Sequence, residues 1–67
     1  MTNEEKRELS SLVKAYRHQL PHGSIFNLME VWCFLKEESG ISFKDSTIRN
    51  YLKAFGGKTI DRGQWTF

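Results

Sequence analysis

The last third of the chain constrains the fold most strongly, because its residue pattern changes once, at Gly56 and Gly57. Before the glycines, apolar residues recur at positions i, i+3, i+4 and i+7 of a helix: Ile48, Tyr51, Leu52 and Phe55. Glycine accepts the left-handed conformation of a helix C-cap, so the pair ends a predicted helix over 45–55. The residues that follow alternate between apolar and polar, which predicts a short β-hairpin over 58–67.

The hairpin is predicted to turn at Arg62 and Gly63, with Gly63 in the positive-φ position. In that register Asp61 faces Gln64, Ile60 faces Trp65, Thr59 faces Thr66 and Lys58 faces Phe67. Alternation then gives the hairpin one apolar face, which consists of Ile60, Trp65 and Phe67. Because two strands alone are only marginally stable, we expect this face to pack on the helices.

Two further helices are predicted upstream. Thr2 and Glu5 form a capping-box pattern at the start of the first, which covers 3–19. Its apolar positions have helical spacing: Leu9, Leu12, Val13, Tyr16 and Leu20. After the break at Pro21, a second helix is predicted over 24–38 with Ser24 as its N-cap. Apolar residues leave only a narrow polar stripe on this helix, which predicts a central helix with neighbours around much of its girth.

The segment between the second and third helices leaves two questions open. Ile41, Ser42 and Phe43 alternate in polarity, which fits either a short strand or a loop tucked into the core. The third helix begins either with Asp45 as N-cap or earlier, with Ser42 and Asp45 as a second capping box.

The 67 residues make one domain, 1–67, of mainly α class. A single cysteine, Cys33, excludes an intramolecular disulfide and fits a reducing compartment. Its neighbours Trp32 and Phe34 predict a buried, inert thiol. No apolar run approaches the roughly 18 residues of a membrane span, and the acidic N-terminus lacks the order of a secretion signal. We therefore expect a cytoplasmic location and no contact with a membrane.

Positive charge is concentrated toward the C-terminus, although the net charge is only +2. From residue 1 to residue 40 there are five basic and six acidic residues, a net charge of −1. From residue 41 to residue 67 there are five basic and two acidic residues, a net charge of +3. The excess lies on the predicted helix and hairpin, where a surface that contacts DNA would need it.

Nothing in the sequence indicates catalysis. It has no nucleophile elbow, phosphate-binding glycine loop or paired acid site. His18 and His22 have the spacing of two zinc ligands on one helical turn, but Pro21 interrupts that turn and no second ligand pair follows. We expect no enzyme activity, metal, cofactor or small-molecule ligand.

The polar face of the 45–55 helix and the hairpin carry side chains suited to DNA. Arg49 is of the type that reads guanine, and Asn50 of the type that pairs with adenine. No acidic residue lies between Ser46 and Ala54. The candidate DNA-binding residues are Ser46, Thr47, Arg49, Asn50, Lys53, Lys58 and Arg62. The alternative interpretation is an ordinary solvated amphipathic helix with a charged turn.

Helix, helix, turn, helix and hairpin together resemble a winged helix-turn-helix domain. Within that superfamily, "LVKAY" near the start and "STIRNYLKAFGG" are similar in arrangement to the DNA-binding domain of bacterial arginine repressors. The resemblance implies that Arg49 and Asn50, in the middle of the third helix, enter the major groove, with Ser46 and Thr47 at the helix start. The chain lacks the arginine-binding oligomerisation domain of that family, so arginine sensing does not follow. "ISFKD" also lengthens the turn before the third helix.

These observations favour a small, sequence-specific protein that binds double-stranded DNA and regulates transcription or recombination, of the kind found in phages and mobile elements. One such module reads few base pairs, so a homodimer or a protein partner is expected to supply further specificity. The alternative is a small interaction module, inhibitor or adaptor that binds a host protein and not DNA, because one fold serves many functions. In that case the acidic first helix, with Glu4, Glu5 and Glu8, is a candidate contact surface.

Overall fold

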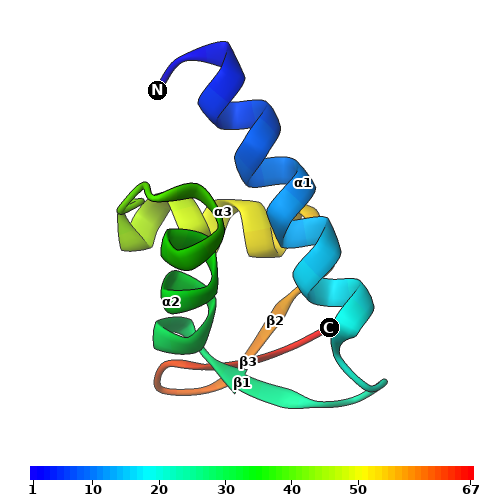
Figure 1. Cartoon of the computed structure of the whole chain (residues 1–67). Helices are drawn as coiled ribbons and strands as arrows, with labels where there is room; N and C mark the ends of the chain where they lie inside the picture. The colour runs from blue at the N-terminus through cyan, green and yellow to red at the C-terminus, as the bar shows by residue number, and fades with distance from the viewer.

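The computed structural model describes every residue from Met1 to Phe67. Three helices and three short strands form one compact body (Figure 1). In chain order they are α1 (Asn3–Gln19), β1 (Ile25–Asn27), α2 (Leu28–Ser39), α3 (Asp45–Ala54), β2 (Lys58–Asp61) and β3 (Gln64–Thr66). The predicted class, mainly α with a C-terminal hairpin and a winged-helix-like layout, is confirmed. The sheet has one strand more than predicted.

Helix α1 begins and ends where the sequence predicts. The hydroxyl of Thr2 accepts the backbone N–H of Glu5 at 3.1 Å, and the backbone N–H of Thr2 donates to the Glu5 carboxylate at 3.1 Å. The Thr2 hydroxyl also donates to the Glu5 carboxylate at 3.1 Å. The two donors of Thr2, the backbone N–H more than the hydroxyl, hold the pKa of the Glu5 carboxyl below its usual range. The helix buries Leu9, Val13 and Tyr16 on one face.

Strand β1 replaces the first turn of the predicted 24–38 helix, and Ser24 is not an N-cap. Phe26 lies opposite Trp65 of β3 in an antiparallel pairing, and the Thr66 hydroxyl donates to the Ser24 carbonyl at 2.8 Å. Helix α2 starts only at Leu28, after Asn27 as N-cap. The prediction was wrong because the pairing partner lies about 40 residues further along the chain, outside any local pattern.

Helix α2 is covered on one side and is not central. Leu28, Val31 and Leu35 are buried, where α1 and α3 pack. On the other side Met29 keeps 66% of its surface exposed, and Cys33 is exposed as well. The prediction of a buried thiol was therefore wrong: Cys33 lies on the face of α2 that no other element covers.

The segment before α3 is a loop, which decides one open question. Phe43 is buried, and its carbonyl accepts the indole N–H of Trp32 at 3.1 Å. Lys44 occupies the N-cap position, so Asp45 is the first helical residue. The helix therefore begins at residue 45, as the predicted range 45–55 has it, but neither Asp45 nor Ser42 is its N-cap. No side chain caps the first turn of α3, which leaves its N–H groups to solvent or a ligand.

Helix α3 ends at Ala54, one residue earlier than predicted. Gly56 adopts a left-handed φ of 89°. The Gly57 N–H donates to the Leu52 carbonyl at 2.7 Å, and a Cβ at Gly57 would lie only 2.7 Å from that oxygen. The two glycines are thus required for different reasons: Gly56 for its conformation, and Gly57 for a close approach of the backbone.

The hairpin forms, but its register differs from the prediction on one side of a β-bulge. The sheet order is β1-β3-β2, and Asp61 pairs with Gln64 as predicted. The bulge lies between Thr59 and Asp61, so that Thr59 and not Ile60 pairs with Trp65. Trp65 is 2% exposed, whereas Ile60 is 50% exposed and does not belong to the core.

One hydrophobic core lies between the helices and the sheet. It consists of Leu9, Val13, Tyr16, Phe26, Leu28, Val31, Leu35, Phe43, Ile48, Leu52 and Trp65. Phe67 lies at its border, stacked on Phe26 with ring centroids 5.2 Å apart. None of the helices is both long and apolar enough to cross a membrane.

Candidate nucleic-acid interface

Four of the seven predicted site residues share one exposed face of α3. Ser46, Arg49, Asn50 and Lys53 are all exposed, at positions i, i+3, i+4 and i+7. The opposite face buries Ile48 and Leu52 in the core. The split into a buried apolar face and an exposed polar face is therefore as predicted, and the hydrophobic core fixes the orientation of the polar face.

Thr47 lies at the border of this face. It is half-buried, one residue before the buried Ile48. A helical side chain reaches only a ligand that lies on its own side of the helix. Thr47 can therefore contact a ligand only at the edge of the polar face. Four of the five predicted residues of α3 therefore lie on one exposed face, and Thr47 lies at the border of that face.

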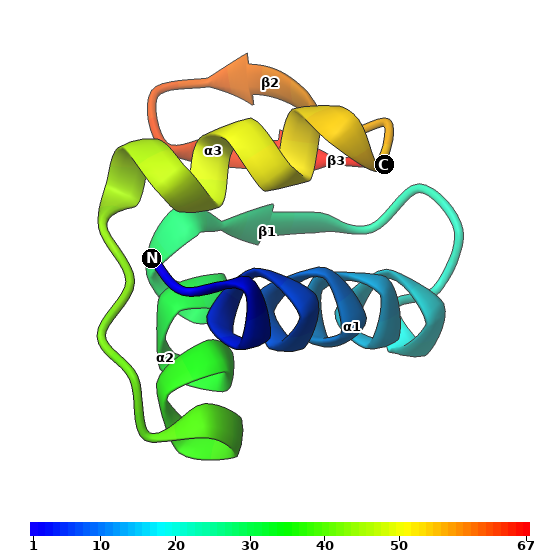
Figure 2. The same cartoon turned by 90° about the horizontal axis from the view of Figure 1, so that it is seen from above.

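Lys58 and Arg62 lie on β2 and on the turn after it, and both are exposed. The chain reverses at the glycines, so that β2 runs back toward the end of the molecule where α3 starts (Figure 2). Lys58 therefore follows the C-terminal end of α3, whereas Arg62 lies toward its N-terminal end. Asp61 is adjacent to Arg62, and its carboxylate accepts the Arg62 backbone N–H at 2.7 Å. The negative charge of this carboxylate offsets the positive charge of the Arg62 side chain.

The start of α2 connects α3 with the hairpin turn. Leu28, Met29 and Trp32 line a shallow hollow of about 280 Å³ together with Asp45 of α3. Leu28 also contacts the hairpin turn, because its backbone N–H donates to the carbonyl of Gly63 at 3.1 Å. The turn is thus held at a fixed place. The exposed apolar side chain of Met29 lines the hollow beside Asp45, the first residue of α3.

The candidate side chains make no hydrogen bonds within the protein. In the hydrogen bonds that involve side chains, the only candidate residue is Arg62, which takes part through its backbone N–H. Asp45, in the first turn of α3, is the only acidic residue of that helix. The guanidinium of Arg49 and the amide of Asn50 therefore keep their hydrogen-bonding groups available to a ligand.

Arg17 positions α3 from outside the predicted site. Its guanidinium Nη1 donates to the Phe55 carbonyl at 2.9 Å, at the end of α3. It also lies over the Phe67 ring, 5.6 Å from the centroid. The residue was missed because its partners are 38 and 50 positions away in the chain. Its position in the last turn of α1, where cations are favoured by the helix dipole, was the only available signal.

His18 and His22 belong to no cluster of potential metal ligands. No group of three or more His, Cys, Asp or Glu side chains in the protein is arranged to hold a metal ion. Helix α1 ends at Gln19, so the two histidines are not on one helical turn. Both instead line an open groove at the far end of α3.

Comparison of the chain with known protein families, with curated proteins and with solved structures gives no significant match. What the site can do is therefore inferred from its residues and their arrangement.

Proposed function

We propose that this protein binds double-stranded DNA with sequence preference and acts as a small regulator of transcription or recombination. The observation that carries the proposal is the exposed face of α3, on which Ser46, Arg49, Asn50 and Lys53 follow one another without an acidic residue between them. Four polar side chains at this spacing match the length of helix that enters a major groove. The layout of three helices and a hairpin is that of winged-helix domains, to which we assign the chain as part of the proposal.

In this proposal α3 lies in the major groove. Arg49 donates two hydrogen bonds to guanine, and Asn50 pairs with adenine. Ser46 and the uncapped N–H groups of the first turn bind a backbone phosphate, which helix N-termini favour. Lys53 binds a phosphate further along, and Thr47 contributes at the edge of the face. Asp45, at the start of α3, opposes phosphate binding there and limits its strength.

The hairpin is the second contact. Lys58 and Arg62 bind the backbone on the side of the duplex toward which β2 runs. Because Leu28 holds the turn through Gly63, Arg62 reaches DNA without ordering a free loop, which lowers the entropy cost of binding. Met29 is exposed and lines the hollow beside Asp45, at the start of α3, so the proposed interface includes an apolar contact of Met29 with the sugar-phosphate backbone.

The proposal predicts that Arg49→Ala and Arg62→Ala each weaken binding to a random-sequence duplex at least several-fold. Each variant removes one phosphate or base contact, and loss of a phosphate contact also reduces the salt slope by about 1. Fluorescence anisotropy at a series of salt concentrations measures both quantities. Both side chains are exposed, so circular dichroism is expected to show an unchanged fold.

Arg7→Ala is the matched control. Arg7 is exposed on α1, and the substitution removes the same charge at a distance from the proposed interface. We expect this variant to bind within a factor of about two of the wild type, since screening limits the effect of a remote charge. Equal weakening by Arg7→Ala and Arg49→Ala would contradict a localised interface and indicate attraction by net charge alone.

A protein-interaction module is the second candidate, favoured by the apolar surface at the start of α2. Met29 is 66% exposed beside the half-buried Trp32, and Ile60 is exposed on the hairpin. Exposed apolar groups rimmed by polar residues mark protein-binding surfaces. This function predicts no DNA binding at low salt and a stoichiometric partner whose binding is lost in Met29→Asp but kept in Arg49→Ala. Retention of the partner by Met29→Asp would exclude this surface.

A further inference from the structure

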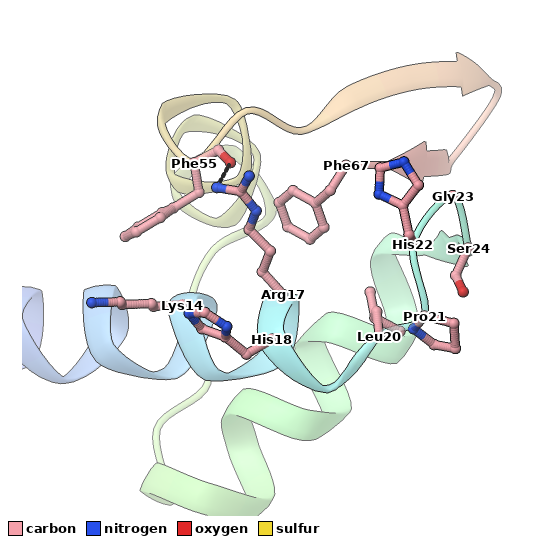
Figure 3. Close-up of a pocket in the computed structure, with 10 residues that line it drawn as sticks. All are labelled: Lys14, Arg17, His18, Leu20, Pro21, His22, Gly23, Ser24, Phe55 and Phe67. Atoms are coloured by element: carbon pink, nitrogen blue, oxygen red, sulfur yellow. Dashed lines mark hydrogen bonds between the residues drawn. The ribbon is translucent and has the colours of Figure 1, made fainter.

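A second candidate site lies at the opposite end of α3 from Ser46. An open groove of about 620 Å³ is formed by the second half of α1, the loop that follows it and the ends of α3 and β3 (Figure 3). Four of its side chains carry basic nitrogen groups: Lys14, Arg17, His18 and His22. None of its lining residues is acidic. The chemistry of the groove is therefore that of a site for an anion.

Arg17 is held in place at the centre of the groove. Figure 3 shows its guanidinium between the side chains of Phe55 and Phe67, with the hydrogen bond to the Phe55 carbonyl at 2.9 Å. That bond uses one of the five N–H donors of an arginine, and the guanidinium carbon lies over the Phe67 ring, 5.6 Å from its centroid. The remaining donors form the planar fork that matches a phosphate or carboxylate.

The ends of two helices also point at the groove and reduce its positive potential. Each C-terminus, of α1 and of α3, contributes roughly half a negative elementary charge. Lys14 and Arg17 contribute two positive charges, which exceed the partial negative charges of the two helix ends. The groove thus carries few charges, which suits a small anion better than a long polyanion.

An aromatic ring is available beside the charged groups. Phe55 lines the groove and is half-buried, and it belongs to none of the aromatic pairs in the protein. Phe67, by contrast, is already stacked on Phe26. The face of Phe55 can therefore stack on a flat ring of a ligand. The volume lies within the range of small-molecule sites, about 300–1,000 Å³, and exceeds what a phosphate alone would fill.

We propose that this groove binds a nucleotide, a phosphate group attached to a flat aromatic base. Arg17 and Lys14 bind the phosphate, His18 and His22 supply further hydrogen bonds, and Phe55 stacks on the base. The sequence led us to expect no small-molecule ligand, because the groove combines residues 14–24 with two phenylalanines from the distant C-terminal third. The proposal does not depend on DNA binding by α3.

Titration of the isotope-labelled protein with AMP in phosphate-free, low-salt buffer tests the proposal by NMR. We expect saturable shifts of the Gly23 and Ser24 amides, which belong to the groove lining, and smaller effects from adenosine or inorganic phosphate alone. Lys14→Gln is expected to weaken AMP binding about two- to fivefold, the range of an exposed ion pair. Lys14 makes no hydrogen bond within the protein, so this variant leaves the fold intact.

Arg7→Gln is the control, because it removes the same charge from an exposed position of α1 outside the groove. Absence of saturable shifts with AMP, or equal weakening by Arg7→Gln and Lys14→Gln, would overturn the proposal. A third titration uses a short DNA duplex in place of AMP. Shifts at Gly23 and Ser24 with the duplex but not with AMP would also overturn it and assign the groove to DNA. If α3 does not bind DNA, the duplex would instead fail to shift the amides around Arg49, and the result with AMP would be unchanged.

Discussion

At the residue scale, one close backbone contact determines how α3 joins the hairpin. Gly57 brings its backbone against the last turn of α3, and a Cβ there would lie 2.7 Å from the Leu52 carbonyl oxygen. That oxygen is itself the acceptor of the Gly57 N–H, so it cannot move away without losing the bond. Glycine at this position therefore sets the angle at which β2 leaves α3. The sequence predicts the helix end from the glycine pair, but only the structure separates their two roles.

Gly57→Ala is predicted to lower the free energy of unfolding by about 1–3 kcal/mol, the usual cost of forcing a methyl group into packed structure. Urea denaturation measures the loss. Gly40→Ala measures backbone strain alone, because Gly40 has no atom within 4 Å of an added Cβ but has a left-handed φ of 74°, which alanine adopts only at a cost of about 1–2 kcal/mol. A loss below about 0.5 kcal/mol in Gly57→Ala would contradict the close approach.

The difference between Ile60 and Trp65 shows how far a residue pattern can predict a hairpin. Alternation correctly places Trp65 in the core and the turn at Gly63, whose φ is 69°. Ile60 was assigned to the same face, but the bulge shifts the register by one residue and leaves Ile60 exposed. A bulge depends on how the strand twists against its partner, and no alternation of residue types reports that.

At the element scale, β1 is the element that the local pattern of apolar and polar residues could not predict. Its three residues are too few to show a period, and their pairing with β3 spans most of the chain. Its C-terminal boundary did carry a signal. Asn27 precedes Glu30 by three residues, as in a capping box, and its backbone N–H donates to the Glu30 carboxylate at 3.4 Å. By contrast, α1 was predicted to its full length because its cap and its apolar face are both local.

A hydrogen bond links β3 to the residue before β1: the Thr66 hydroxyl donates to the Ser24 carbonyl at 2.8 Å. We predict that Thr66→Val lowers the free energy of unfolding by about 1 kcal/mol, because the shape is kept while the Ser24 carbonyl loses its donor. Thr59→Val makes the same change at an exposed residue of β2 and is expected to alter stability by less than about 0.5 kcal/mol. Thermal or urea unfolding compares the two. Equal effects of the two substitutions would show that the bond contributes nothing.

At the scale of the whole molecule, α3 connects two surfaces of different character. Its exposed face carries Ser46 near the start and Arg49 in the middle, and Met29 lines a hollow beside Asp45. Strand β2 leads to the hairpin turn at the same end of the molecule where α3 starts (Figures 1 and 2). At the end of α3 the chain forms the basic groove around Arg17. The first surface was predictable because all its charged residues fall within one short stretch of sequence. The groove was not, because it requires α1, the loop after it and the C-terminal residues to meet in space.

The salt dependence of binding to a random-sequence DNA duplex tests the central claim most directly. The proposal places three cationic side chains, Lys53, Lys58 and Arg62, on backbone phosphates, so the logarithm of the association constant should fall with the logarithm of salt concentration at a slope of about −2.7. Fluorescence anisotropy of the wild-type protein from low to physiological salt gives this slope. Measurable binding that weakens steeply with salt is the predicted result. No binding at low salt would contradict DNA as the ligand of α3.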